Sequence, residues 1–406
     1  MCNAFAGISS YLCSRNDSTA KMLTLGIAQA SSALLSLNRI IVGVKLQQTI
    51  SNMRKNMIFG AVAAMAALAL VACNQQQTQK VDGLVIEKQG VFSSGGRVTE
   101  PIAGEYDATQ NWLDQERKGT TTHVDHASTL YQIPAGGNGT PVVFLHGYGQ
   151  TRTGWQSTPD GREGWSDLFL RKGYSVFLVD QPRRGAAGAT EEIVTDPGDV
   201  SNGKFKVGEQ AWYTHFRIGR VAPERYEGSQ FPEGDEAQRQ FFFQMTPNTG
   251  NYDEKLFGAA LSDVLSDVQR MTGKKSIYVT HSQGGRVGWA TDADNIAAIV
   301  AVEPGFAPQI GSDDYKKFVA AKTPMLFLFG DYIENGPEDI QSTGFWKMVL
   351  NQCREFAVQY VKDDGDATVI YLPDEGIKGN SHFMFQEMNN GEIADLVEKW
   401  LKEHNL

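Results

Sequence analysis

The segment Ser276-Ile-Tyr-Val-Thr-His-Ser-Gln-Gly-Gly285 runs from a β-branched strand directly into a serine flanked by small residues. A serine on a sharp strand-to-helix turn exposes its Oγ, and small residues two positions before and after it let neighbouring backbones approach. Gly284 meets this requirement fully and Thr280 only in part. The segment therefore predicts a nucleophile elbow centred on Ser282, and a plain Ser-Gln-Gly turn that ends a strand is the alternative.

Three further segments carry groups that a nucleophilic serine requires. Upstream, an apolar strand at residues 142–145 ends in the loop His146-Gly147, where a backbone N–H is placed to help bind a developing oxyanion. Downstream, the continuous apolar run at residues 296–302 predicts a buried strand, and Glu303 follows it directly. His382 follows late in the chain, after one more apolar stretch. A nucleophile, an acid and a base therefore occur in that order.

Short apolar segments alternate with segments of helical periodicity through residues 81–406. This alternation predicts an α/β fold with a mainly parallel sheet covered by helices on both faces. The spacing of apolar residues predicts one helix that ends at Gly273 and another near the C-terminus. Residues 81–134 alternate polar and β-branched side chains, which favours antiparallel strands at the sheet edge. The expected strands of the main sheet are residues 142–145, 174–180, 276–280, 296–302, 325–329 and 368–371.

Residues 185–253 fit no strand of this sheet and are rich in glycine, proline and aromatic residues. Long irregular insertions in compact domains are commonly functional, so we expect a cap over the site, with surface packing as the alternative.

Two histidines close together in the sequence, His123 and His126, are candidate metal ligands. In a strand they point to opposite faces, and no third ligand cluster lies nearby, so we expect no metal and no cofactor.

The N-terminal part resembles a bacterial lipoprotein signal. Residues 53–57 form a short basic region with Arg54 and Lys55, residues 58–72 are a run of apolar residues and glycine, and Cys73 follows small residues. Lipidated Cys73 would then be the first mature residue, residues 73–80 a polar tether, and the bacterial cell envelope the location, with the periplasm or outer membrane expected for a Gram-negative source. A buried helix with an inert cysteine is the alternative.

If Met53 is the true start, residues 1–52 are an upstream extension, although an uncleaved anchor at residues 22–44 stays open. The chain has 406 residues and 41% hydrophobic residues, enough for a substantial core. Its formal charge of −10 argues against nucleic acid as the main partner. Of the four cysteines, Cys2, Cys13 and Cys73 lie in these N-terminal segments, so Cys353 is left alone and a disulfide framework is excluded.

Residues 91–401 resemble the α/β-hydrolase superfamily, and within it a small group of bacterial serine esterases in which a glutamate is the triad acid. The resemblance rests on His146-Gly147, Thr158-Pro-Asp-Gly-Arg-Glu-Gly-Trp165, Leu170-Arg-Lys-Gly-Tyr174, Asp180-Gln-Pro-Arg-Arg-Gly185, Arg225-Tyr-Glu-Gly228, Gln244-Met-Thr-Pro247, Thr280-His-Ser-Gln-Gly284, Glu303-Pro-Gly305 and Asn380-Ser-His382.

This resemblance implies that Ser282 is the nucleophile, His382 the general base and acid, and Glu303 the group that orients the imidazole. It also implies that backbone N–H groups of Tyr148 and Gln283 form the oxyanion hole.

Other residues compete for some of these roles. Many relatives carry the acid after the next strand, where Asp331 and Glu334 are the rivals for it. His146 can be a loop-packing residue, and His281 is expected to pack or donate a hydrogen bond without taking part in the chemistry.

The resemblance implies a serine carboxylic-ester hydrolase that works through an acyl-enzyme. The aromatic insertion favours an apolar or ring-bearing ester of unknown identity. Two alternatives remain: an amidase, lactonase or thioesterase of the same fold, and a non-catalytic binding lipoprotein.

Overall fold

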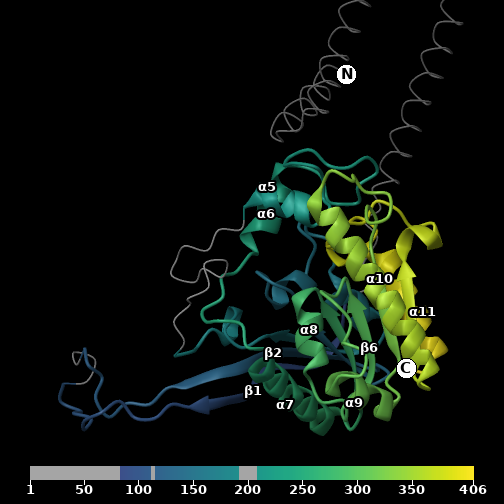
Figure 1. The fold of residues 1–406 in the computed structure, drawn as a ribbon. Helices are drawn as coiled ribbons and strands as arrows, with labels where there is room; N and C mark the ends of the chain where they lie inside the picture. Colours follow the sequence, from purple (N-terminus) through teal and green to yellow (C-terminus); the bar gives the residue numbers. More distant parts are fainter. Residues whose placement is uncertain (1–82, 111–114, 192–207) are drawn as a thin grey trace, which may run out of the picture. The chain divides into compact units, whose positions relative to one another are not determined.

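A single eight-stranded sheet runs through the described part of the chain, residues 83–110, 115–191 and 208–406 of this computed structural model. Its strand order is β1-β2-β4-β3-β5-β6-β7-β8 (Figure 1). The predicted signal, tether and Cys73 lie outside the described residues. The strands are β1 (Ile86–Val98), β2 (His123–Pro134), β3 (Pro141–Leu145), β4 (Ser175–Asp180), β5 (Ser276–His281), β6 (Ile296–Val302), β7 (Met325–Phe329) and β8 (Ala367–Tyr371).

The predicted α/β fold is confirmed. Strands β3 to β8 pair in parallel, and β1 and β2 form the expected antiparallel edge. Every strand predicted for the main sheet is present, and the bounds of β6 and β7 match the prediction. Strands buried on both faces read as continuous apolar runs, which makes them recognisable in a sequence.

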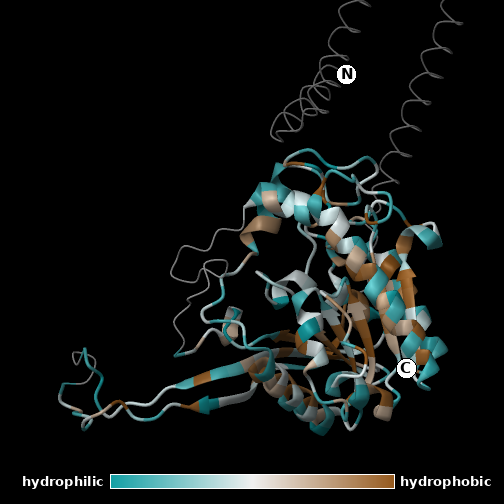
Figure 2. Cartoon of the chain, viewed as in Figure 1, coloured by the Kyte–Doolittle hydropathy of each residue, from teal (hydrophilic) through white to brown (hydrophobic). Residues whose placement is uncertain are grey.

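Helices cover both faces of this sheet, and alternate strand residues point to each cover. Leu145 and Val143 face the layer of α7 (Glu254–Thr272), α8 (Gln283–Trp289), α9 (Asp313–Ala321) and α10 (Gln341–Lys362). Phe144 and Val142 face α4 (Trp165–Arg171) and α11 (Asn390–Glu403). Figure 2 shows the central strands as the most hydrophobic part of the fold.

Helix α7 illustrates how local sequence sets an element. Asp253 caps its start, because Oδ1 accepts hydrogen bonds from the backbone N–H groups of Lys255 (3.1 Å) and Leu256 (3.0 Å). Gly273 ends it with φ +74°, a left-handed conformation that glycine adopts without strain. The apolar side between these ends packs on the sheet, so this helix carries the chain to β5 and Ser282.

The insertion contributes α5 (Glu209–His215) and α6 (Asp235–Phe243) in its described part, and no sheet strand lies in residues 185–191 or 208–253. Helix α5 packs beside the start of α10, where the Ser342 hydroxyl donates to the Thr214 carbonyl (3.0 Å) and Trp346 Nε1 to the His215 carbonyl (2.7 Å) (Figure 1). Among the described residues, none forms a helix long and apolar enough to cross a membrane.

His123 and His126 border one surface depression, together with Gly95 and Gly96. Between them, Asp125 has φ +59°, and the register of β1 against β2 is the same on either side of it, with Gly95 opposite His126 and Arg97 opposite Val124. That the two imidazoles point to opposite faces stays a prediction. No group of three potential metal ligands occurs among the residues described.

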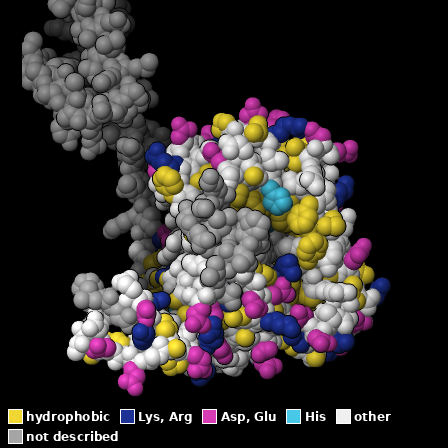
Figure 3. Space-filling view, turned by 60° about the vertical axis from the view of Figure 1, so that its left-hand side comes forward, with side chains coloured by type: hydrophobic (Ala, Val, Ile, Leu, Met, Phe, Trp, Pro, Cys, Tyr) yellow, Lys and Arg dark blue, Asp and Glu magenta, His cyan; other side chains and the backbone are white. Residues whose placement is uncertain are grey.

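The surface in Figure 3 mixes acidic and basic side chains, and hydrophobic side chains gather around one histidine.

Candidate active site

Ser282 stands on the sharp turn between β5 and α8. Its backbone has φ +54° and ψ −122°, a conformation rarely tolerated by residues other than glycine. Hydrogen bonds hold this turn in place: the Ser282 N–H donates to the Val302 carbonyl (3.1 Å), and the Ser282 carbonyl accepts from Gly285 (2.9 Å) and Gly305 (3.2 Å). Strain of this kind is common at functional sites. The predicted elbow is therefore present as a backbone structure.

Close backbone approach explains the glycines around the turn. A Cβ added to Gly284 would lie 2.5 Å from the His146 carbonyl oxygen, and one added to Gly147 would lie 2.9 Å from Ser282 Cβ. Thr280 stands where such a turn usually has a smaller residue, and helix α8 leaves room for its side chain. Its Cγ2 would lie 3.1 Å from a Cβ at Gly288, so glycine there leaves room for the larger side chain.

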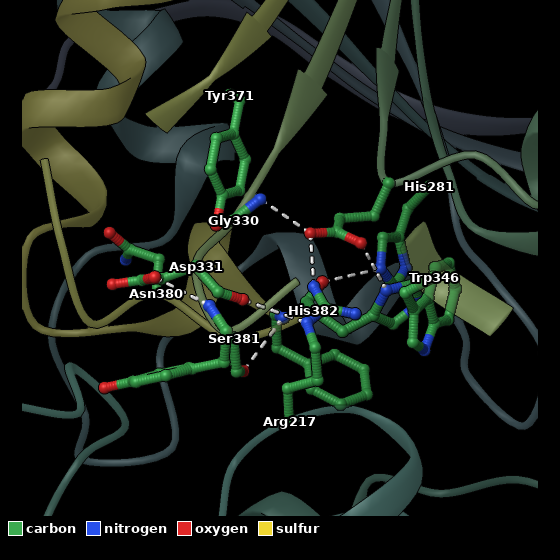
Figure 4. A network of polar contacts seen from close by, with 12 residues as sticks. Arg217, His281, Gly330, Asp331, Trp346, Tyr371, Asn380, Ser381 and His382 are labelled. Carbon is green, nitrogen blue, oxygen red and sulfur yellow. Dashed lines mark hydrogen bonds and ion pairs between the residues drawn. The ribbon is translucent and has the colours of Figure 1, made fainter. Parts of the chain in front are cut away.

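Glu303 and His382 are brought together in a buried pair. Glu303 directly follows β6 with φ +46°, and its Oε2 lies 3.2 Å from His382 Nδ1. Its other oxygen, Oε1, accepts a hydrogen bond from the Gly330 N–H at 2.6 Å. Burial raises the pKa of Glu303, whereas Arg217 and Gly330, both bonded to Oε1, oppose that rise. Figure 4 shows Arg217, Gly330 and His382 meeting at this carboxylate.

The two rival carboxylates have other partners. Asp331 Oδ1 accepts from the Tyr332 N–H (2.7 Å) and Oδ2 from the Gly379 N–H (2.8 Å), so this side chain organises the turn beside His382. Glu334 forms a partly exposed ion pair with Arg354 (2.5 Å). Across the described ranges, Glu303 is the carboxylate whose contact with His382 the geometry supports.

His382 is enclosed by aromatic rings. Its imidazole stacks on Phe216, with 4.6 Å between ring centroids, and Trp346 lies 4.5 Å away in a tilted arrangement. Its Nε2 is buried and has no hydrogen-bond partner among the described residues, so the hydrogen bond to Ser282 is not formed in this structure. Burial first, then the neighbouring Arg217 and His215, hold the pKa of His382 well below its usual range. This environment favours the neutral imidazole, the form in which it can accept a proton.

Two more histidines support this loop. His281 Nδ1 lies 2.9 Å from Gln150 Oε1, and its Nε2 lies 3.0 Å from the His382 carbonyl. His146 Nδ1 lies 2.9 Å from the Gly147 carbonyl, and burial lowers the pKa of His146 to about 4. His281 and His146 thus contact loop atoms around the site, in the supporting roles considered from the sequence.

The segments predicted to form an oxyanion hole lie side by side. Gln283 is the first residue of α8, where backbone N–H groups have no acceptor within the helix. Tyr148 follows Gly147 on the facing loop. Buried Arg184 joins the two segments, because Nη1 donates to the Gly147 carbonyl (3.1 Å) and Nη2 to Gln283 Oε1 (2.6 Å).

Sequence patterns gave no signal for Arg217 and Glu387. Arg217 lies 86 residues before Glu303, which it binds, so no local motif links them. Glu387 accepts from the Ser381 N–H (3.0 Å) and Asn380 Nδ2 (2.8 Å), and burial raises its pKa to about 7. It thereby fixes the loop that carries His382.

The chain belongs to the alpha/beta hydrolase family, whose model matches residues 142–347. It is similar to a probable secreted lipase, phiG, of Fungal sp. (strain ATCC 74256), with 26% identity over 316 residues that cover 65% of this chain and 82% of the lipase. A solved structure described as a novel bacterial esterase superposes with a TM-score of 0.65 and 29% identity, covering 80% of this chain and 98% of the esterase. The fold is thus that of a hydrolase with lipase and esterase relatives.

Proposed function

We propose that this protein is a serine carboxylic-ester hydrolase with Ser282 as nucleophile, His382 as general base and acid, and Glu303 as the orienting acid. The observation that carries the proposal is the buried 3.2 Å contact between Glu303 and His382, combined with a strained serine elbow one strand away in the same sheet. The esterase and lipase relatives support ester hydrolysis.

The reaction would proceed in two steps. Ser282 Oγ attacks the ester carbonyl while His382 Nε2 takes its proton, and the backbone N–H groups of Tyr148 and Gln283 stabilise the oxyanion. His382 then protonates the leaving alcohol, and water, activated by the same imidazole, hydrolyses the acyl-enzyme. The unpartnered Nε2 fits this role, because catalytic hydrogen bonds in substrate-free structures commonly tighten only when substrate binds.

Aromatic side chains beside His382 favour an apolar or aromatic ester. The ring centroid of Phe383 lies 5.3 Å from that of Phe216 and 5.7 Å from that of Trp212, so the insertion and the catalytic loop pack together through aromatic rings. Phe216 is only partly buried, so it is the ring that would contact an apolar substrate group. A cap function for residues 185–253 is part of this proposal.

A substrate panel separates the esterase from hydrolases of the same fold. p-Nitrophenyl acyl esters, the matched p-nitroanilides, acyl thioesters and lactones would be compared by kcat/KM. We expect the esters to be the best substrates by at least about tenfold. A preference for anilide, thioester or lactone would reassign the bond that is cleaved. Folded protein with no turnover in the panel would favour the binding lipoprotein.

We also propose that Cys73 is lipidated and anchors the protein in the bacterial cell envelope, with a small-molecule ester and the membrane as its partners. The basic, apolar and cysteine-containing order of residues 53–73 supports this, and the secreted relative supports export. Intact-mass analysis of membrane-extracted protein should show a diacylglyceryl-modified chain that begins at Cys73. An unmodified chain that retains residues 53–72 would contradict the anchor.

A further inference from the structure

We propose that Arg217 is a positioning residue for the catalytic pair, so that the insertion supplies part of the charge network around Glu303 and His382. This inference rests on the proposed function. Arg217 Nη2 donates to Glu303 Oε1 at 2.5 Å, and its Nε donates to the Asp331 carbonyl at 3.0 Å. The guanidinium is buried and lies over the Trp346 ring, 5.1 Å from its centroid. Two further contacts, from the loop after β7 and from α10, therefore hold it beside the carboxylate.

The two oxygens of Glu303 have separate tasks. Oε1 accepts from Arg217 and Gly330, whereas Oε2 faces His382 Nδ1. A planar guanidinium bound at one oxygen restricts the plane of the carboxylate, and this restriction aims the second oxygen at the imidazole. Without Arg217, only the Gly330 N–H would hold Oε1.

Arg217 also compensates a charge that would otherwise be unfavourable. Glu303 is fully buried, and an ionised carboxylate is costly in such a place unless it is paired and hydrogen-bonded. His382 cannot supply the pairing cation while it is neutral. Arg217 therefore favours the ionised form of the carboxylate, the form that stabilises the imidazolium during catalysis.

Backbone contacts tie this part of the insertion to the catalytic loop. The His382 N–H donates to the Phe216 carbonyl (3.1 Å), and the Gln230 N–H donates to the Gly379 carbonyl (2.7 Å). Arg217 has φ +62°, which turns its side chain inward from a strained backbone position. Phe216 and Gln230 thus each bind the loop that carries His382.

Charged and titratable groups reach His382 from several elements. Glu303 contacts it from the end of β6, His281 from β5, and Arg217 and His215 from the insertion. Asp331 turns its carboxylate to Tyr332 and Gly379, and Glu387 binds the neighbouring Ser381 N–H. Arg217 opposes a positive charge on His382, since like charges disfavour protonation.

The test compares Arg217→Gln and Arg217→Lys with the wild type by the pH dependence of kcat/KM and by NMR titration of His382. Loss of the cation should raise the pKa of His382, and since catalysis needs the neutral ring, the acidic limb should move to higher pH. We expect kcat to fall at least about tenfold in the Gln variant with KM changed less than about threefold. Arg217→Lys keeps the charge, so its acidic limb should stay near the wild-type position while kcat falls.

Arg220→Gln is the matched control, because Arg220 lies in the same insertion but pairs with Asp339 at the surface. It should leave kcat, KM and the acidic limb unchanged. If Arg217→Gln does not fold, the test rests on Arg217→Lys, in which a lower kcat would support the positioning role. Wild-type kcat and an unshifted His382 titration in both Arg217 variants would overturn the positioning role. Absence of Ser282-dependent turnover in the wild type would instead defeat the proposed function, and the NMR titration would still decide whether Arg217 acts on His382.

Discussion

Replacing Ser282 with alanine is expected to lower kcat for a p-nitrophenyl ester by roughly 10⁴- to 10⁶-fold. The variant lacks the only group that the proposal allows to attack the carbonyl, and it keeps the small residues that shape the turn. The substituted alanine would still need φ near +54°, so folding should be checked by circular dichroism. Steady-state kinetics on folded protein give the result directly.

Ser276→Ala is the matched control for this prediction. Ser276 lies at the other end of β5, and its buried Oγ has no hydrogen-bond partner among the described residues. Its replacement should therefore leave kcat within about twofold of the wild type. A Ser282→Ala variant with more than about a tenth of the wild-type kcat would exclude Ser282 as the nucleophile.

The second large effect is expected for Glu303→Gln, which should lower kcat by roughly 10³- to 10⁴-fold. An amide cannot stabilise the imidazolium, and it can place an N–H toward His382 Nδ1 and so favour the wrong tautomer. The change also leaves Arg217 buried without its carboxylate. Loss of one partner of a buried ion pair costs about 3–5 kcal/mol, so the free energy of unfolding should fall as well.

Asp331→Asn separates the two acid assignments. Asp331 is buried near Glu303, but its oxygens organise the turn through the Tyr332 and Gly379 N–H groups. An asparagine keeps one of these acceptors, so kcat should fall by less than about tenfold. If Asp331→Asn abolishes turnover while Glu303→Gln does not, the acid lies after β7 and the present assignment is wrong.

Much of the sheet could be predicted because its physical cause is local. Strand β6 is a continuous apolar run buried on both faces, and α7 has an Asp253 cap and a terminal glycine. The elbow at Ser282 also has a local signature, since close backbone approach requires small neighbours. Each of these features depends on residues that lie close together in the sequence.

The sequence favoured Glu303 as the acid but left Asp331 and Glu334 as rivals. Glu303, Asp331 and Glu334 all follow buried strands, and parallel strands bring such positions to the same edge of the sheet. Only the side-chain geometry shows which oxygen meets His382. Arg217 was missed for a similar reason, because its partner is distant in the chain and the insertion has no repeating pattern.

Fluorophosphonate labelling with peptide mass mapping tests the central claim most directly, because it reports the reactive residue without knowledge of the substrate. The folded protein should carry one adduct, located on Ser282. Labelling should vanish in Ser282→Ala, slow strongly in Glu303→Gln, and persist in Ser276→Ala. Folded wild-type protein that forms no adduct, or forms it on another residue, would contradict the assignment of this site as a serine hydrolase centre.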